Sequence, residues 1–596
     1  MGCVSISRSH LSDAKRAAKQ GLSSATGLCG SSSTFDFEIL AQVHCNRFWL
    51  GLRLNRTALA RRTGTMPAEE TKELEAHAPP LAVERTVPLW EKHGTVDPSR
   101  STAHEAASGD AEVVEPPLLS GFMVARMRQL GLDGPRDALD AVAPLWEMPI
   151  EEQLARKQDE MRALVSRLLP GEGGASCEPI RSLRASCDDK VAPPMRNTCE
   201  MSIGRDRSGS ACCGFRLGVA SSQDGNAVAP PSGVPFVPAW MVAAADECTA
   251  AMRELDGARE EGDGEEGLPP LPYLSLRLRG SLRTLEAVAV LTARDPPLAG
   301  ARATPAESDL AGRLAHAAAR HNQSLRAVLI RDVEGGCLPV LQPEKDAPAS
   351  CDTPEVGTIV EELRSGLRLH VSPLAFFQVS TEAAEVLFST VVEMATIDGF
   401  PDMVLDLCCG GGVLGLEVAR AAAEQGAEAT RVLGIELSTS GARDARVNAA
   451  ANSLRHPQYE VICGKAEDCI GAIAGAATSA NAVAILDPPR TGMAPSVCKA
   501  LRATEAVKRV VLCSCNPHGH NLRRDFVVKG GSLAANLRVL CSERGRGTPF
   551  RVERIVPIDL FEHTPHVELC VLCVRAPSRS PTSTRPRPTR RERKRP

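Results

Sequence analysis

The 596-residue sequence contains few aromatic side chains and no long run of apolar residues. Aromatic residues make up 3% of it, whereas Gly and Pro are frequent, at 48 and 43. A helix needs about 20 consecutive apolar residues to cross a bilayer, and no segment approaches that length. We therefore expect a protein without membrane spans, and the abundance of Gly and Pro predicts that part of the chain is unstructured.

The sequence also lacks clustered metal ligands. Its 21 cysteines are scattered, and the close pairs are Cys212 with Cys213, Cys408 with Cys409, Cys513 with Cys515, and Cys570 with Cys573. Structural zinc and iron-sulfur sites need several ligands at set spacings. We expect no metal and no iron-sulfur cluster, and scattered thiols without a signal peptide favour a reducing, intracellular compartment.

The sequence also has no marked excess of positive or negative charge. The formal net charge is -4, but such a sum mixes acidic linkers with basic faces. Charge therefore neither supports nor excludes a nucleic-acid partner. The length predicts two or three domains with connecting segments.

Composition divides the chain into five parts. Residues 1–115 are predicted to be a disordered or targeting extension and linker, because the first 65 residues hold nine Lys or Arg and few acids. An organelle transit peptide, a disordered extension and a true start at Met66 all remain open. The nucleus or cytoplasm is the expected location, or a mitochondrion or plastid if the extension is a transit peptide.

Periodicity organises the rest. Residues 116–175 form a predicted helical segment with an amphipathic helix at 150–169, where charged residues such as Lys157 lie between apolar ones. Residues 176–375 are predicted to be an α+β substrate- or RNA-binding region, and residues 576–596 a basic disordered tail. In the α+β region residues 274–279 alternate like a strand, and Arg277 and Arg279 are candidate phosphate contacts.

Residues 376–575 alternate apolar runs with helical segments. The runs at 404–407, 432–435, 483–486 and 510–512 predict an open, largely parallel α/β sheet. Ligands of such sheets bind where the carboxyl ends of the strands meet. Polar residues directly after these runs are therefore candidate site residues.

A Gly-rich turn follows the first run. Residues 406–412 read Asp-Leu-Cys-Cys-Gly-Gly-Gly and open a helix near Val413, and small residues let a ligand approach the backbone. The second run ends at Glu436, whose carboxylate can accept both hydroxyls of a ribose. Together they predict a cofactor that contains adenosine. The third run ends at Asp487, which two prolines follow, so this carboxyl is predicted to project into the same crevice.

The fourth run delivers Cys515 to that edge, followed by Asn516 and Pro517. A cysteine alone is more often an inert buried thiol. Here, however, the segment resembles the SCNP motif of the RNA uracil-5-methyltransferases. Four further segments resemble motifs of that family in the same order: residues 376–379 (FFQV), 406–412 (DxxCGxG), 487–490 (DPPR) and 559–568 (DxF..TxHxE).

The resemblance covers roughly residues 140–575 and extends upstream through residues 144–146, 152–154 and 156–158. It implies a class I, Rossmann-like domain that binds S-adenosylmethionine and methylates C5 of a uridine. Cys515 is the implied nucleophile and Glu568 the implied proton acceptor. The implied or predicted cofactor contacts are Gln378, Cys408, Gly410, Gly412, Val413, Glu436 and Asp487.

Family resemblance implies tRNA as the partner, with the T-loop uridine, position 54 of tRNA, as the usual target. Ribosomal RNA is the alternative substrate, because the same catalytic residues serve both in related proteins. A tRNA-folding factor with incidental methylation is an alternative of another class. We expect a monomer. Met195, Thr198 and Val413 depart from the family pattern, so RNA and cofactor contacts can differ there.

Overall fold

The structure is a computed structural model. It describes residues 37–44, 47–54, 137–169, 177–183, 196–217, 227–257, 270–295, 302–331, 337–341, 353–427, 429–454, 457–477, 481–518 and 531–576. The chain divides into two units, residues 1–112 and 113–596. The basic tail and most of the predicted extension lie outside the described residues.

In the first unit the structure describes one antiparallel strand pair, β1 (Phe37–His44) with β2 (Arg47–Leu54). Composition did not foresee this hairpin. The remaining residues predicted as extension and linker carry no described structure, so the assignment of residues 1–115 stays a prediction.

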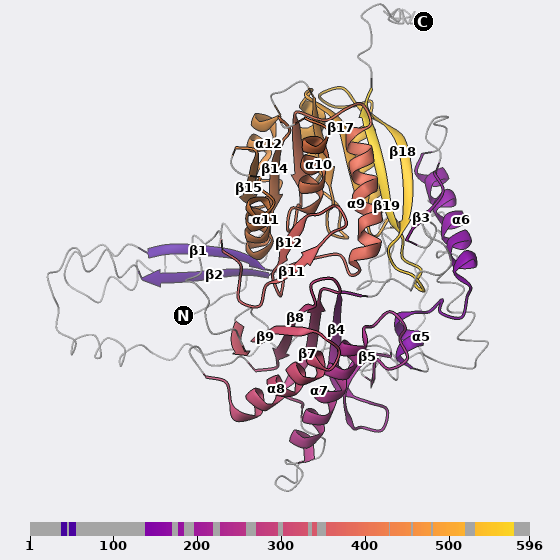
Figure 1. Ribbon diagram of the computed structural model, residues 1–596. Helices are drawn as coiled ribbons and strands as arrows, with labels where there is room; N and C mark the ends of the chain where they lie inside the picture. Colours follow the sequence, from indigo (N-terminus) through magenta and orange to yellow (C-terminus); the bar gives the residue numbers. More distant parts are fainter. Residues whose placement is uncertain are drawn as a thin grey trace, which may run out of the picture. The chain divides into compact units, whose positions relative to one another are not determined.

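The second unit is built around an eight-stranded sheet, in the order β15-β14-β13-β16-β17-β19-β18-β3 (Figure 1). Neighbouring strands from β15 to β17 are parallel, and β19 is antiparallel to both β17 and β18. This is the α/β, Rossmann-like sheet that the alternating runs predict. The strands are β3 (Arg181–Ser182), β13 (Met403–Leu407), β14 (Arg431–Glu436), β15 (Tyr459–Cys463), β16 (Ala482–Leu486), β17 (Val507–Ser514), β18 (Phe550–Asp559) and β19 (Glu568–Arg575).

Helices cover both faces of this sheet, so its central strands are buried on both sides, as parallel strands usually are. Val404, Val483 and Val511 face one apolar cluster with α9 (Thr381–Thr396), α10 (Val413–Glu424) and α11 (Thr439–Ala451). Alternate residues such as Leu405 and Leu512 face a second cluster on the other side. Its helices are α6 (Ile150–Leu168), α12 (Ile470–Ala476), α13 (Pro495–Ala503) and α14 (Gly531–Cys541).

The α+β region contains a seven-stranded sheet, in the order β10-β9-β8-β7-β4-β5-β6. Its strands are β4 (Thr198–Arg205), β5 (Ala211–Arg216), β6 (Val228–Ala229), β7 (Tyr273–Gly280), β8 (Glu286–Ala293), β9 (Ser324–Arg331) and β10 (Cys337–Leu341). Helices α7 (Ala239–Gly257) and α8 (Pro305–Ala319) pack against it in one apolar cluster. A short helix, α5 (Ala138–Val142), joins this cluster, and a separate pair, β11 (Ile359–Glu362) with β12 (Arg368–Val371), precedes α9.

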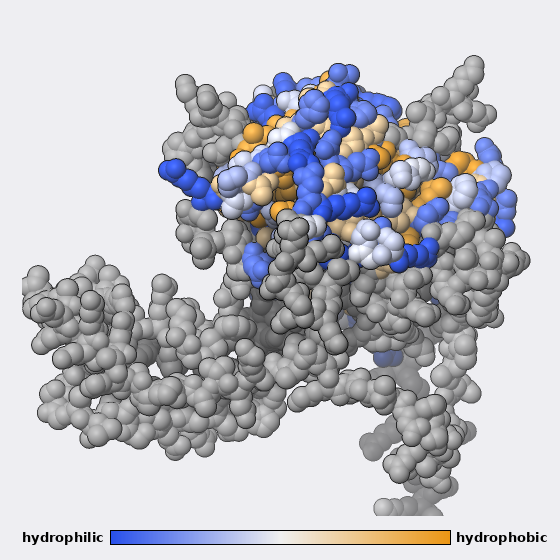
Figure 2. All heavy atoms as spheres, turned by 90° about the horizontal axis from the view of Figure 1, so that it is seen from below, coloured by the Kyte–Doolittle hydropathy of each residue, from blue (hydrophilic) through white to orange (hydrophobic). Residues whose placement is uncertain are grey.

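Figure 2 shows one face of the molecule from below, where hydrophilic side chains cover much of the coloured surface and hydrophobic ones lie among them in small patches. Among the described residues, no helix combines the length and the apolar character that a bilayer crossing requires. The cysteines described are free thiols.

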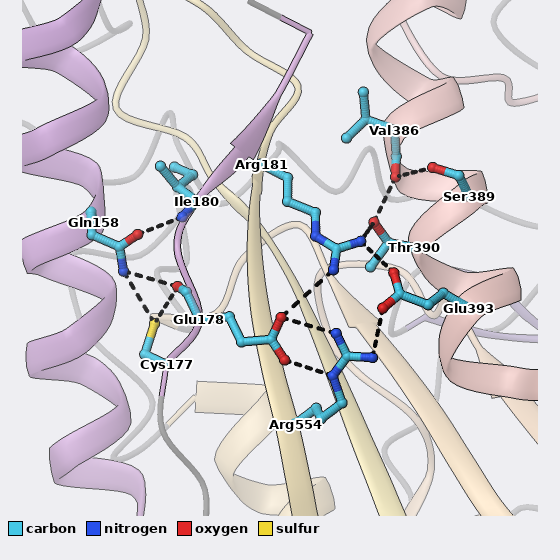
Figure 3. A network of polar contacts seen from close by, with 10 residues as sticks. All are labelled: Gln158, Cys177, Glu178, Ile180, Arg181, Val386, Ser389, Thr390, Glu393 and Arg554. Carbon is cyan, nitrogen blue, oxygen red and sulfur yellow. Dashed lines mark hydrogen bonds and ion pairs between the residues drawn. The ribbon is translucent and has the colours of Figure 1, made fainter. Parts of the chain in front are cut away.

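An ion-pair network ties the edge of the eight-stranded sheet to α9 (Figure 3). Arg554 on β18 donates to both oxygens of Glu178, at 2.6 and 3.0 Å, and to Glu393 on α9 at 2.8 Å. Arg181 on β3 also donates to Glu393, at 2.7 Å. Because these groups are partly exposed, the network contributes more to geometry than to stability.

Two expectations about basic residues are wrong. Lys157 was placed among the charged positions between the apolar ones of its helix, but it is fully buried and donates to Asp559, 402 residues away in sequence. Arg279 is only 3% exposed and donates to the carbonyl of Ala375 at 2.6 Å, so it is no surface phosphate contact. Arg277 is ion-paired with Glu200 at 2.5 Å.

Candidate active site at the carboxyl edge of the eight-stranded sheet

Parallel pairing brings four strand ends to one edge of the sheet. In the register of these strands Leu407 is opposite both Ile435 and Leu486, and Leu486 is opposite Leu512. The residues that follow these positions include Cys408, Glu436, Asp487 and Cys515. The sheet therefore gathers most of the predicted site residues.

The Gly-rich turn adopts backbone angles that favour glycine. Gly410 and Gly412 have φ values of 53° and 83°, and Cys408 also has a positive φ, 65°. A Cβ on Gly412 would lie 2.3 Å from Oη of Tyr459, which donates to the Gly412 carbonyl at 3.2 Å. At Gly410, by contrast, nothing lies within 4 Å of a Cβ position. The turn is thus packed tightly against Tyr459 at Gly412, whereas the space beside Gly410 is open. Val413, the first residue of α10, is buried.

Glu436 binds the backbone of this turn at Gly410, where the turn is open. Its two carboxylate oxygens accept from the backbone N–H of Gly410 at 2.9 Å and of Ser438 at 2.7 Å. The carboxylate is half-buried, so it retains access to a ligand above Gly410. Each carboxylate oxygen has two lone pairs, and two donors leave capacity for further hydroxyl groups.

Asp406 lies beneath the turn, without exposure to solvent. Its Oδ2 accepts from the Gly415 N–H at 2.9 Å, which fixes the start of α10, while Oδ1 has no hydrogen-bond partner. The pKa of Asp406 is raised to about 7, mainly by burial and also by the charges of the nearby carboxyls of Asp487 and Glu436. The Gly415 hydrogen bond acts in the opposite direction.

Cys515 and Glu568 lie close together at the end of two neighbouring strands, and the charge of Glu568 raises the pKa of Cys515. β17 and β19 pair antiparallel, with Cys513 opposite Cys570 and Ser514 opposite Leu569. The next position in this register places Cys515 opposite Glu568, and directly opposed residues have Cβ atoms about 5 Å apart. Two segments that are far apart in sequence therefore deliver a thiol and a carboxyl to one place.

The thiol opens on a small pocket. Its walls come from the turn after β16, from the end of β17 and from α14, namely Pro488, Pro489, Arg490, Gly492, Leu512, Cys513, Ser514, Cys515, Leu533 and Asn536. Burial, together with the charges of the Glu568 and Asp487 carboxyls, raises the pKa of Cys515 to about 11. Arg490 acts in the opposite direction, through its charge and a hydrogen bond to the thiol.

Glu568 is 1% exposed, and its Oε1 has no hydrogen-bond partner. Burial raises the pKa of Glu568 well above its ordinary value, the charge of Asp487 adds to this, and the Ser514 backbone N–H opposes it. Burial also raises the pKa of Asp487, to about 6. Two carboxyls this close disfavour double ionisation and tend to share a proton.

Asp487 connects the two halves of the site. Its charge influences the pKa of Asp406 and Cys408 at the glycine turn and of Cys515 and Glu568 at the pocket. Most of the predicted site residues therefore belong to one electrostatic unit. Buried carboxyls with raised pKa values in a crevice are typical of functional sites.

Gln378 lies on a different segment, just before α9. The backbone carbonyl of Gln378 accepts from Asn197 Nδ2 at 2.8 Å, and the same nitrogen donates to Thr381 Oγ1 at 2.9 Å. Asn197 is buried and precedes β4. The recorded contacts of Gln378 are thus with the α+β region, and its predicted cofactor contact stays a prediction.

One functional candidate was missed from the sequence. Arg490 completes the Asp-Pro-Pro-Arg segment, but its place in that segment does not reveal a role. Only the fold shows that the turn after β16 and the end of β17 line the same pocket. A cation beside a thiol favours the thiolate, and Arg490 lowers the pKa of Cys515, although burial and the two carboxyls outweigh it.

Comparison with known proteins gives a consistent family. tRNA (uracil-5-)-methyltransferase homolog A of Homo sapiens is 30% identical over 478 residues, which covers 76% of this chain and 70% of that protein. Homolog B of Homo sapiens is 36% identical over 223 residues, 36% of this chain and 40% of that protein. No protein-family model matches the chain.

Among solved structures, tRNA (uracil-54, C5)-methyltransferase of Pyrococcus abyssi, in complex with S-adenosyl-L-homocysteine, aligns with a TM-score of 0.44 at 18% identity. The alignment covers 72% of this chain and 85% of that one.

Proposed function

This chain belongs to the tRNA (uracil-5-)-methyltransferase family, and on that premise we propose that it methylates C5 of a uridine in tRNA through a covalent bond from Cys515 to C6 of uracil. The T-loop uridine at position 54 is the proposed target. The observation that supports the mechanism is the antiparallel register of β17 and β19, which ends with Ser514 opposite Leu569 and so makes Cys515 and Glu568 the next residues of the two neighbouring strands.

The glycine turn suits S-adenosylmethionine. The open space above Gly410 and the Glu436 carboxylate beside it fit a ribose whose hydroxyls donate to a carboxylate. Gly412 and Cys408 shape the turn, and Asp406 holds it from below. When bound, the cofactor supplies an electrophilic methyl carbon, which bonds to C5 while its sulfur keeps the electron pair of the broken bond.

Cys515 supplies the activation that C5 needs. Its thiolate adds to C6, and the π electrons of the C5–C6 bond move toward C5 and the neighbouring carbonyl, so that C5 becomes nucleophilic. Arg490 favours the thiolate through its charge and a hydrogen bond, and so offsets part of the opposing effect of burial and the two carboxyls on the pKa of Cys515. The uridine must leave its stack to reach this pocket, as bases do in enzymes that modify them.

Glu568 completes the reaction as the base. After methylation C5 carries both a methyl group and its original hydrogen. The carboxylate takes that proton, the C5–C6 double bond forms again, and the electron pair of the C6–S bond returns to Cys515. A carboxyl with a raised pKa is suited to this transfer near neutral pH, and Asp487 contributes to the raised value.

Trapping with 5-fluorouridine-substituted tRNA tests this proposal. Fluorine at C5 cannot leave as a proton, so in the presence of S-adenosylmethionine the complex should remain covalent through denaturing electrophoresis. Cys515→Ala should abolish the adduct, whereas Cys337→Ala, at an exposed thiol on β10, should leave it unchanged. An adduct that persists in Cys515→Ala would refute the assignment.

Mapping the modified nucleotide tests the substrate. After exposure of unmodified total RNA to the protein, 5-methyluridine is expected in the T-loop of tRNA. Methylation confined to ribosomal RNA would overturn the tRNA proposal while leaving the chemistry intact.

A further inference from the structure

Helix α6 buries a row of polar side chains. Gln153, Lys157 and Glu160 follow one another at spacings of four and three residues, which places them on one side of a helix. They are 1%, 0% and 5% exposed. Burial of polar and charged groups is costly unless each finds partners, so the contacts of this row need an explanation.

Lys157 and Gln153 bind the loop between β18 and β19. Lys157 Nζ lies 2.8 Å from Asp559 Oδ1 and donates to the Phe561 carbonyl at 3.1 Å. Gln153 Oε1 accepts from the His563 N–H at 2.9 Å, and its Nε2 lies 3.0 Å from His563 Nδ1. His563 has a positive φ of 63°, a conformation that needs such support. This loop leads directly into Glu568.

Glu160 contacts the turn that follows the nucleophile. Its Oε1 lies 2.9 Å from Nε2 of His518, three residues beyond Cys515 in the same turn. Its other oxygen, Oε2, has no hydrogen-bond partner among the described residues. One helical face thus contacts both the turn that follows the nucleophile and the loop that leads to the base.

We propose that the α6 row positions the two catalytic groups separately, with Glu160 aligning Cys515 through His518, and Lys157 and Gln153 aligning Glu568 through the β18–β19 loop. These three are positioning residues, since none belongs to the reacting pair. The inference rests on the proposed function, because it assigns each contact to one step of that reaction. A misplacement of about 1 Å can slow a reaction by as much as 10²-fold.

The two steps can be measured apart. Adduct formation with 5-fluorouridine tRNA requires thiol attack and methyl transfer but no removal of a C5 proton. Turnover on ordinary tRNA requires both of these steps and also removal of the C5 proton by the base. Lys157→Met should lower turnover at least about tenfold and leave the rate of adduct formation within about twofold of wild type. The methylated covalent complex should then accumulate on ordinary tRNA. Glu160→Gln should lower both rates by a similar factor.

Matched variants separate positioning from general damage. Arg162→Met removes a cation from the same helix, but at an exposed ion pair with Asp159, and should change neither rate. Lys157→Arg should restore part of the turnover. If Lys157→Met does not fold, the double variant Lys157→Met, Asp559→Asn removes both buried charges, and Asn can still accept from the Phe561 N–H that Asp559 now binds at 3.0 Å. Unchanged affinity for S-adenosyl-L-homocysteine establishes that the catalytic sheet is intact.

Equal losses in both rates for folded Lys157→Met, or no loss in either variant, would overturn the inference. Failure of wild type to form an adduct or to methylate uridine would instead refute the proposed function. The two failures are therefore distinct.

Discussion

Carboxylates of the seven-stranded sheet and carboxyls at the edge of the eight-stranded sheet lie in opposite electrostatic surroundings. In the seven-stranded sheet charges pair with each other: Arg277 and Arg331 both contact Glu200, and Arg205 donates to both oxygens of Asp256. Burial raises the pKa of Glu200, but the hydrogen bond and charge of Arg277 and the charge of Arg331 outweigh it, so the net pKa is lowered. At the edge of the eight-stranded sheet, Asp406, Asp487 and Glu568 all have raised pKa values.

Topology explains the difference. In the first sheet the antiparallel register of β4 and β7 places Glu200 opposite Arg277, and Arg205 on β4 contacts Asp256 on α7. The parallel strands of the second end at one edge, and their terminal carboxyls gather without an equal number of cations. Glu200 and Asp256 are thus paired with arginines, whereas Asp406, Asp487 and Glu568 meet near one edge with raised pKa values.

Removal of the base should have the largest effect. Glu568→Gln keeps the size of the side chain but cannot accept the C5 proton, so turnover should fall on the order of 10² to 10⁴-fold. The covalent complex should accumulate on ordinary tRNA, visible by denaturing electrophoresis. Turnover within a few fold of wild type would show that another group is the base.

Neutralisation of Asp406 should change the pH dependence of stability. Its pKa is raised from an ordinary value near 4 to about 7, so the folded state holds the proton more tightly, and stability falls as pH rises through this window. Asp406→Asn should remove that loss and be more stable than wild type at pH 8, on the order of 1 to 4 kcal/mol. Chemical denaturation at pH 5 and pH 8 measures it, and an advantage equal at both values would contradict the assignment.

A methyl group on the glycine turn should weaken cofactor binding. Gly412→Ala introduces a Cβ at a φ of 83° and 2.3 Å from Tyr459 Oη, a strain of about 1 to 3 kcal/mol. The affinity for S-adenosyl-L-homocysteine, measured by calorimetry, should fall by about one order of magnitude or more. Gly312→Ala is the control in α8 of the other region, where nothing lies within 4 Å of the new atom; equal losses in both would be evidence against a specific role for the turn.

The smallest effect is expected in the seven-stranded sheet. Glu200→Gln removes a carboxylate with a lowered pKa, whose contribution to stability is present above the unfolded pKa and disappears as pH falls. Because the group is partly exposed, the loss should be about 0.2 to 1 kcal/mol at pH 7 and should disappear once the pH falls below the lowered pKa of Glu200. This sign is opposite to that of Asp406→Asn, and a gain in stability at neutral pH would break the comparison.

Much of the catalytic sheet could be predicted from the sequence. The apolar runs correspond to β13, β14, β16 and β17, and the residues after them meet at one edge because parallel strands must share it. The helix at 150–169 and the strand at 274–279 are also present, as α6 and β7.

What the sequence could not reveal depends on contacts across long separations. Lys157 was placed among the charged positions of an amphipathic helix, and its buried contact with Asp559, 402 residues away in sequence, could not be seen from the sequence. The opposition of Cys515 and Glu568 depends on the antiparallel register of β17 and β19, which no motif encodes. Arg279 was a candidate for phosphate contact, and only the packing of β7 against the segment at Ala375 shows it to be buried.

Mass mapping of the trapped complex tests the central claim most directly. After adduct formation with 5-fluorouridine tRNA and digestion of both components, the methylated nucleotide should remain on the peptide that contains Cys513 and Cys515, and fragmentation should place it on Cys515. Cys513 is fully buried and lies 3.6 Å from Cys570, so attachment there, or to a peptide from elsewhere in the chain, would contradict the account.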